Sequence, residues 1–225
     1  MARCRAAGKM FLAIGNNGEK ARESMFRIPR HVGIIPDGNR RWAKGKGLKK
    51  EEGYAFGLEP GITLLRAAKK YGIRELTYYG FTVDNCKRPP AQVRAFSRAC
   101  VEAVKRMEEE NVRPYVVGNT ESSCFPAELL PYTERREDGS DELRVNLLVN
   151  YGWEWDMKND WVSQKIPRVD MVIRWGGMCR LSGFLPIQTV YADFCILDDL
   201  WPDFREEQFA YALSWYQEQD VTLGG

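Results

Sequence analysis

The sequence predicts a single α/β domain with a central, mainly parallel six-stranded sheet flanked by helices. The chain has 225 residues, of which 44% are hydrophobic and 28% charged, enough for one sizeable core. Segments rich in β-branched and aromatic residues alternate with amphipathic segments from His31 onward, as in parallel sheets covered by helices. Neither a repeat nor a linker divides the chain, so we expect one domain over residues 30–220, after a loosely held extension over residues 1–29.

Six short apolar runs are predicted to be the strands. Each is rich in valine, isoleucine, leucine or aromatic residues, and most are followed by polar or glycine-containing segments. In chain order they are residues 31–36, 75–81, 113–118, 143–152, 169–175 and 191–197.

Four segments carry helix signals. Residues 57–73, 89–111 and 204–219 repeat apolar residues at helical spacing, and residues 125–137 do so with an interruption at Pro131. The longest begins with proline, which suits a first helical position. One face of it carries Val93, Phe96, Cys100, Val104 and Met107.

Charge and cysteine usage limit the functional class. The net charge of +2 gives no general case for binding nucleic acid. The six cysteines are scattered without a C-x-x-C pair, and a single histidine argues against a Cys/His zinc site. Such thiols are typical of the reducing cytoplasm, which is the expected location. No apolar run approaches the length that spans a bilayer, and the N-terminal "MFLAIG" is too short for a signal peptide.

The first predicted strand runs into a charged turn, "GIIPDGNRRWA". Gly38 allows a tight turn, and a helix is expected to begin there with its free N–H groups facing an anion. Arg40 and Arg41 suit phosphate oxygens. Asp37 would be repelled by phosphate unless a divalent cation lay between them, as Mg²⁺ commonly does. From the residues alone, a helix-capping aspartate beside two surface arginines is an equal alternative.

Two later segments are expected at the same sheet edge, where parallel sheets bind ligands. Residues 82–88 follow the second strand, although alone they resemble an ordinary strand-to-helix loop. Residues 174–183, "RWGGMCRLSG", combine two arginines, a glycine pair and a serine, which predicts a second anion cradle. Asp193 either completes a metal site or is a plain acid at a strand edge. The common nucleotide-binding fingerprints are absent from the sequence.

Five ordered motifs resemble the cis-prenyltransferase family of the undecaprenyl diphosphate synthase type. They are "HVGIIPDGNRRWAK", "YYGFTVDNCKRP", "VNLLVNYG", "VDMVIRWGGMCRLSGFLPIQTVYADF" and "LWPDF". The resemblance implies a sheet around an apolar tunnel, a Mg²⁺ cofactor and a homodimer. It also implies condensation of an allylic prenyl diphosphate with isopentenyl diphosphate, giving a cis-prenyl diphosphate of short to medium chain. A peripheral contact with a membrane, through the lipid product, would follow.

The same resemblance assigns roles to residues. Asp37 would hold magnesium together with Asp193 and assist departure of the allylic diphosphate, and Asn85 is at the position proposed to take the proton. The implied substrate-binding residues are Gly38, Asn39, Arg40, Arg41, Trp42, Lys50, Tyr54, Thr82, Val83, Asp84, Arg88, Arg174, Arg180, Leu181 and Ser182.

Several positions depart from the family pattern. Tyr54 stands where the family has histidine after glycine, Lys50 replaces an arginine, and Cys86 replaces a tryptophan. Only residues 157–168 separate "NYGWEWD" from "VDMVIR", where the family usually has helices of the subunit interface. Dimer geometry and product length therefore remain open.

Two alternatives follow from these departures. The Gly-Tyr pair is similar to the family's branched-product offshoot, which includes cyclolavandulyl diphosphate synthase. Such an enzyme would couple dimethylallyl diphosphate irregularly, head to middle, to a branched or cyclic product. The altered loop over residues 82–86 and the short segment also leave open a non-catalytic member that binds a partner subunit or a prenyl diphosphate.

Overall fold

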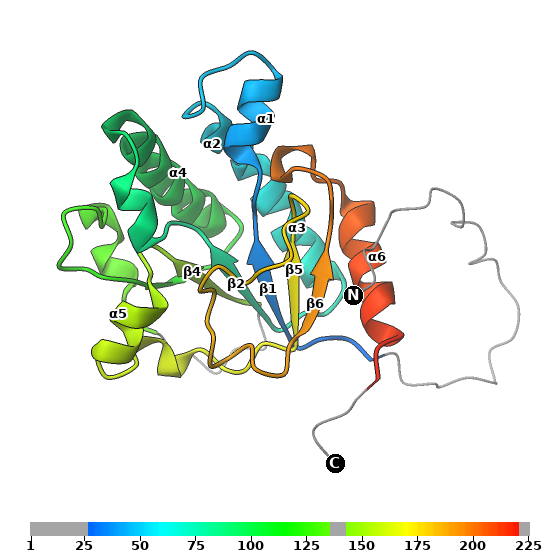
Figure 1. Ribbon diagram of the computed structural model, residues 1–225. Helices are drawn as coiled ribbons and strands as arrows, with labels where there is room; N and C mark the ends of the chain where they lie inside the picture. The colour runs from blue at the N-terminus through cyan, green and yellow to red at the C-terminus, as the bar shows by residue number, and fades with distance from the viewer. Residues whose placement is uncertain (1–26, 136–142, 221–225) are drawn as a thin grey trace, which may run out of the picture.

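Six parallel strands form the central sheet (Figure 1) in this computed structural model, which describes residues 27–135 and 143–220. The strands are β1 (His31–Ile35), β2 (Glu75–Tyr79), β3 (Tyr115–Val117), β4 (Arg144–Leu148), β5 (Met171–Arg174) and β6 (Asp193–Ile196). Their order is β3-β4-β2-β1-β5-β6, and every neighbouring pair is parallel. The predicted α/β fold is confirmed, and all six strands lie within their predicted segments.

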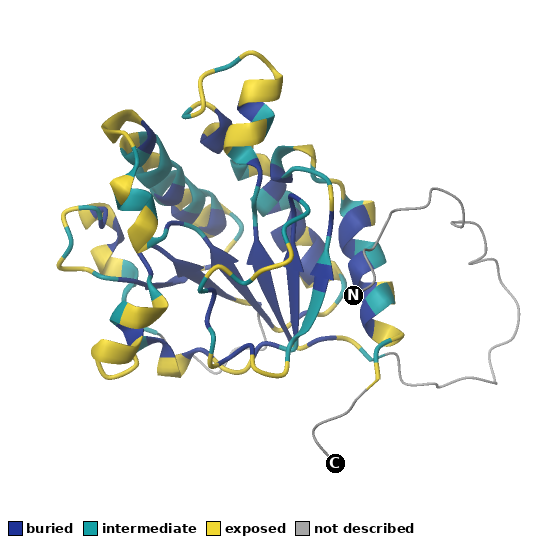
Figure 2. Cartoon of the chain, viewed as in Figure 1, coloured by how far each residue is buried: buried dark blue, intermediate teal, exposed yellow. Residues whose placement is uncertain are grey.

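One face of the sheet is covered by the three longest described helices. These are α3 (Leu58–Lys70), α4 (Pro90–Glu109) and α6 (Glu206–Gln217). Side chains of all three enter the larger core cluster with Val32 and Ile34 of β1. Strands β1, β2, β3 and β5 are buried throughout, the edge strand β6 is mostly half-buried, and the outer sides of the helices are exposed (Figure 2). The helical periodicity predicted these elements because each places one apolar stripe against the sheet.

Two short helices lie near the carboxyl end of β1. They are α1 (Asn39–Gly45) and α2 (Gly53–Phe56), which contact each other. A Cβ on Gly53 would come 2.2 Å from the backbone oxygen of Asn39, so only glycine permits this approach. The α2 helix was not predicted, because four residues carry too little periodicity to reveal a helix.

The opposite face is covered by irregular chain and the short α5 helix (Trp153–Lys158). In the short segment after β4, the side chain of Asp156 is buried, with 2% exposure. This carboxylate accepts hydrogen bonds from the Tyr151 hydroxyl at 2.8 Å and from the backbone and hydroxyl of Ser163 at 2.9 and 2.6 Å. A buried polar network thus holds this segment together.

Two expectations about individual segments need adjustment. The segment predicted as a helix over residues 125–137 is a 3₁₀ helix over Ala127–Tyr132, with Pro131 inside it, and residues 136–137 lie outside the described part. Residues 1–26 of the predicted extension also lie outside it. Arg27 is held firmly, because its guanidinium lies 2.8 Å from Asp193 and 3.9 Å from the ring centroid of Tyr216. None of the described helices is long and apolar enough to cross a membrane.

Candidate active site

A cavity of about 630 Å³ lies at the carboxyl ends of β1, β2 and β5. Because these three strands are neighbours and parallel, the segments that follow them meet at one edge of the sheet. Most of the predicted site residues line this cavity: Asp37, Gly38, Asn39, Arg40, Arg41, Lys50, Tyr54, Thr82, Asp84, Asn85, Arg88, Arg174, Arg180 and Ser182.

The first cradle is the turn between β1 and α1. Gly38 precedes the helix with a φ of 116°, a left-handed conformation that favours glycine. A Cβ there would also come 2.8 Å from the Leu200 side chain. The turn directs Arg40 and Arg41 toward the cavity. Arg41 donates from both terminal nitrogens to the Gly176 carbonyl, each at 3.0 Å, and so joins this turn to the one after β5.

The second cradle is organised around Arg174, which is 4% exposed. Its Nη1 donates to the backbone oxygen of Arg180 and, at 3.0 Å, to the Ser182 hydroxyl. The Tyr79 hydroxyl donates to the Ser182 carbonyl at 2.9 Å. Arg174 therefore holds the loop in shape as well as lining the cavity, which leaves Arg180 and Ser182 at the surface of the cradle.

Asp37 connects the two cradles by charge. Its Oδ2 accepts from Arg174 Nη2 at 2.8 Å, and its Oδ1 lies 3.5 Å from Arg41 Nη2. About a third of the Asp37 side chain is exposed, at 33%, so the carboxylate still faces the cavity. Asp37 therefore pairs with both arginines, and these ion pairs lie inside the cavity rather than on the outer surface.

The segment after β2 forms a 3₁₀ helix over Val83–Lys87 at the rim of the cavity. Thr82 and Asn85 form a reciprocal capping box, in which Asn85 N–H donates to the Thr82 hydroxyl at 3.3 Å and Asn85 Oδ1 accepts from Thr82 N–H at 3.4 Å. The box fixes the Asn85 side chain at the rim. Asp84 pairs with Lys87 at 2.7 Å in an exposed ion pair.

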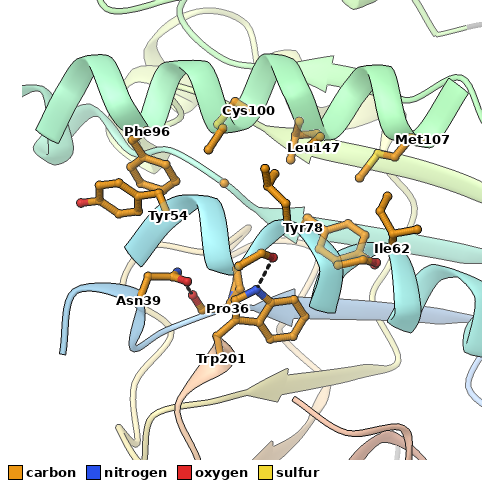
Figure 3. Close-up of a pocket in the computed structure, with 16 residues that line it drawn as sticks. Pro36, Asn39, Tyr54, Ile62, Tyr78, Phe96, Cys100, Met107, Leu147 and Trp201 are labelled. Carbon is orange, nitrogen blue, oxygen red and sulfur yellow. Dashed lines mark hydrogen bonds between the residues drawn. The ribbon is translucent and has the colours of Figure 1, made fainter. Parts of the chain in front are cut away.

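An apolar pocket of about 80 Å³ lies between α3 and α4 beside this cavity (Figure 3). It runs from Tyr54 and Phe96 at one end to Ile62 and Met107 at the other. The lining is almost entirely hydrophobic, which is the setting expected for a hydrocarbon chain. The structure thus shows a short apolar pocket at this place, and the tunnel implied by the resemblance stays a prediction.

Four predicted site residues do not line the cavity. The Trp42 indole donates to Asp203 Oδ1 at 2.8 Å and packs on Phe56. Val83 lies against Gly152, and Leu181 packs into the second core cluster. These positions are near the site in the sequence, but their side chains are directed elsewhere by neighbours that local patterns do not reveal.

Asp193 is the fourth, and its placement requires a correction. In the sheet register Asp193 pairs with Met171, whereas Ile35, two residues before Asp37, pairs with Arg174. The two acids therefore lie at opposite ends of the parallel strands, and one chain cannot join them at one magnesium ion. Burial raises the pKa of Asp193, and its ion pair with Arg27 opposes that shift.

The described residues contain no cluster of three or more His, Cys, Asp or Glu side chains that could hold a metal ion. A magnesium ion in this cavity would rely on Asp37 and on oxygens of a bound diphosphate. This donor set fits, because Mg²⁺ is commonly held by one or two carboxylates together with substrate phosphates.

Several cavity residues were missed by the sequence analysis: Lys44, Tyr79, Phe96 and Met178. Lys44 follows Arg40 by four residues, a spacing that places both on one helix face, so this signal was available. Phe96 was assigned to the core face of its helix. That face borders both the core and the cavity. Which of the two a side chain on it contacts depends on the neighbouring helix, which the local sequence does not reveal.

The sequence also matches known proteins. Residues 35–163 and 157–224 match the family described as "Putative undecaprenyl diphosphate synthase". A ditrans,polycis-undecaprenyl-diphosphate synthase of Yersinia pseudotuberculosis is 34% identical, over 88% of this chain and 91% of that protein. An isoprenyl transferase of Thermus thermophilus is 30% identical, over 88% and 89%.

Among solved structures, the fold is similar to lavandulyl diphosphate synthase from Lavandula x intermedia, with a TM-score of 0.73 and 22% identity. The match covers 88% of this chain and 99% of that one. The family match spans most of the sequence, and the two cradles occupy the same sheet edge. The chain therefore belongs to the undecaprenyl diphosphate synthase family of cis-prenyltransferases.

Proposed function

We propose that the protein condenses an allylic prenyl diphosphate with isopentenyl diphosphate, with Mg²⁺ as cofactor, to a cis-prenyl diphosphate of short to medium chain. The observation that carries this proposal is the pairing of two arginine cradles in one cavity that adjoins an apolar pocket. Two cradles suit two diphosphates, and the pocket suits a hydrocarbon tail.

In the proposed reaction, the bond between the allylic carbon and the diphosphate oxygen breaks, and the diphosphate keeps the electron pair. Arg40 and Arg41 would stabilise the charge that develops on this leaving group. Bound Mg²⁺ would neutralise part of the same charge, with Asp37 as its protein ligand. The double bond of isopentenyl diphosphate, held by Arg180 and Ser182, then forms the new carbon–carbon bond.

Loss of a proton from the resulting cation completes the proposed reaction. Asn85 lies on the cavity rim, where the capping box holds its side chain, and it is the proposed site of proton removal. Because a neutral amide does not retain a proton, the departed diphosphate would accept the proton there. The apolar pocket would keep water from the cationic carbon. The spacing of the cradles would set the distance between the two reacting carbons.

The small pocket supports a short product. A cavity of about 150 Å³ in another protein is large enough to hold benzene. The pocket here, at about 80 Å³, is smaller and suits a short tail. This size also supports a second candidate, irregular coupling of dimethylallyl diphosphate alone, because both of its substrates have five-carbon tails.

The proposal extends to assembly and location. Ile187, Val190 and Tyr191 precede the edge strand β6 and are 43%, 64% and 59% exposed. We propose that this apolar surface contributes to a homodimer, which light scattering of the purified protein would detect. A cytoplasmic enzyme with peripheral membrane contact through its product is the corresponding expectation.

The test is incubation of purified protein with Mg²⁺, labelled isopentenyl diphosphate and allylic primers of five, ten and fifteen carbons. Labelled organic-soluble product is expected. Product from dimethylallyl diphosphate without isopentenyl diphosphate would instead favour irregular coupling. Binding of a prenyl diphosphate without turnover of any primer would favour the non-catalytic alternative and overturn the proposal.

A further inference from the structure

Two thiols meet beside the 3₁₀ helix that carries Asn85. Cys86 belongs to this helix, and Cys124 lies in the loop that follows β3. The two thiols are in hydrogen-bonding contact, and both side chains are half-buried against the larger core cluster. Cys86 is also one of the positions that depart from the family pattern. The pair therefore joins an atypical residue of the cavity rim to a second segment of the chain.

Asn150 links the two segments that carry these thiols. Its Oδ1 accepts from Cys86 Sγ at 3.1 Å, and its Nδ2 donates to the Asn119 carbonyl at 3.1 Å. Asn150 is 1% exposed, so water cannot readily replace either partner of its amide. The reduced Cys86 thiol therefore helps to hold the 3₁₀ helix against the segment that follows β4.

The same segment holds the start of this 3₁₀ helix. Val83 N–H donates to the Tyr151 carbonyl at 3.0 Å. The helix thus has two attachments to the segment, one through its first residue and one through Cys86. Asn85 lies between them and Arg88 follows the helix, and both of these residues line the cavity. A change at Cys86 is therefore transmitted directly to the cavity rim.

We propose that Cys86 and Cys124 form a reversible disulfide on oxidation, and that this bond lowers turnover by displacing the 3₁₀ helix. The two sulfurs must approach to about 2.05 Å, so Cys86 Sγ leaves Asn150 and its helix moves with it. Displacement of a positioned group by about 1 Å can cost about a hundredfold in rate. The effect on turnover rests on the proposed function, whereas formation of the bond does not.

The oxidant in this inference is a peroxide. The Cys124 thiolate attacks a peroxide oxygen, the O–O bond breaks, and hydroxide leaves, so Cys124 becomes a sulfenic acid. Burial raises the pKa of Cys86, and its proton is held by Asn150, so Cys86 acts second. Its sulfur then attacks the Cys124 sulfur, the S–S bond forms, and the S–O bond breaks. Two thiols and one hydrogen peroxide give one disulfide and two waters.

The experiment treats the purified full chain with hydrogen peroxide and maps disulfides by mass spectrometry of peptides prepared without reduction. A disulfide between Cys86 and Cys124 is expected, with a fall in kcat/KM of about tenfold or more that dithiothreitol reverses. Cys124 lines neither the cavity nor the pocket. Cys124→Ser should therefore keep kcat/KM within about twofold of wild type before treatment, and should lose less than about twofold after it.

Two further variants complete the experiment. Cys179→Ser is the matched control, because Cys179 is an exposed thiol outside the pair, and this variant should respond to peroxide as the wild type does. Cys86→Ser should accumulate a sulfenic acid at Cys124, which dimedone labels. No label there would overturn the assigned order of attack.

Three results would overturn the inference itself. One is the absence of the disulfide between Cys86 and Cys124 at a peroxide dose that oxidises the exposed Cys179. Another is complete formation of the disulfide with kcat/KM unchanged. The third is an equal loss of kcat/KM in the wild type and in Cys124→Ser, because the inhibition would then come from oxidation elsewhere.

Failure of the inference can be separated from failure of the proposed function. Mapping the disulfide needs no substrate, so its absence rejects the inference even in an active enzyme. If the wild type makes no product from any primer, the proposed function is wrong. Calorimetry with an unreactive prenyl thiolodiphosphate then compares the reduced and oxidised proteins. The disulfide should weaken binding by about threefold or more, because it displaces Arg88 at the cavity, and an unchanged dissociation constant would reject the effect on the site.

Discussion

Asp37→Asn is the most informative single substitution, because Asp37 joins the two cradles and is the proposed magnesium ligand. The amide preserves the shape of the side chain and removes its charge. In the native protein the carboxylate lies 2.8 Å from Arg174 and 3.5 Å from Arg41. The change therefore perturbs charge at the centre of the site with little change in volume.

The expected loss of stability is modest. The Arg174 side chain is 5% exposed, and in the Asp37→Asn variant it would keep its charge without a carboxylate partner. A hydrogen bond to a charged group contributes about 1.5–3 kcal/mol to the free energy of unfolding. Because a third of Asp37 is exposed, the lower end applies, about 1.5 kcal/mol after solvent screening. For a chain of this size that lowers the melting temperature by about 3–6 °C.

The expected loss of turnover is much larger. If Asp37 holds Mg²⁺ against the leaving diphosphate, losing its charge should lower kcat by about a thousandfold, the upper range for one electrostatic contact in a site. Melting temperature and initial rates with saturating primers would be measured on the same preparation. A folded Asp37→Asn protein that keeps turnover near the wild-type value would refute the assigned role.

Asp170→Asn is the matched control. Asp170 Oδ2 accepts from the backbone N–H groups of Arg30 and His31 at 2.8 and 2.9 Å, beside the other end of β5. This variant should lose comparable stability and keep turnover within about threefold of wild type, since it is remote from the charge that develops. Equal loss of turnover in both variants would assign the Asp37 effect to general destabilisation.

Three further predictions concern packing, pH and metal. Gly53→Ala places a Cβ 2.2 Å from the Asn39 carbonyl oxygen, so it should displace Tyr54 and lower both the melting temperature and kcat/KM. The control Gly45→Ala, whose Cβ would have nothing within 4 Å, should change neither quantity. Equal effects of the two substitutions would contradict this packing. Burial lowers the pKa of His31 below its ordinary value of 6.5, so the folded state binds fewer protons than the unfolded state and the free energy of unfolding should fall as pH drops below about 6.5. Urea titrations at about pH 7.5 and pH 5.5 should show a smaller fall in His31→Gln than in the wild type. Equal falls in the two proteins would contradict this role of His31. Removing Mg²⁺ with a chelator should abolish turnover, and adding Mg²⁺ back should restore it. The melting temperature should stay within about 1 °C, since the metal would be held largely by the substrate. Turnover that persists with the chelator would show that the reaction does not need Mg²⁺.

The strands and main helices were predictable because their signals are local. Val32 and Ile34 are buried in a short β-branched run typical of a core strand, and the stripe from Val93 to Met107 has the period of a helix. The charged turn at Asp37 was also recognisable, since carboxylate, glycine and guanidinium groups are adjacent in the sequence.

Other site features depend on contacts between distant segments. Lys44 could have been found from helical spacing, but the direction of Trp42 depends on Asp203. The stacking of Tyr54 on Phe96 depends on the contact between α2 and α4. Gly53 permits a second close approach, between α2 and Asn39 of α1. Such approaches are governed by side-chain packing among several elements and leave no periodic signal.

The sequence by itself determined the α/β class, the two cradles and the apolar character of the helices that flank the pocket. Only the tertiary structure decided which charges meet. Arg174 reaches Asp37 because β5 pairs with β1 in a register that ends both strands together. Asp193 is carried to the opposite end because β6 begins where β5 begins. In a parallel sheet the strand register determines which residues share an edge, and the register of β1 with β5 arises from packing between segments more than a hundred residues apart.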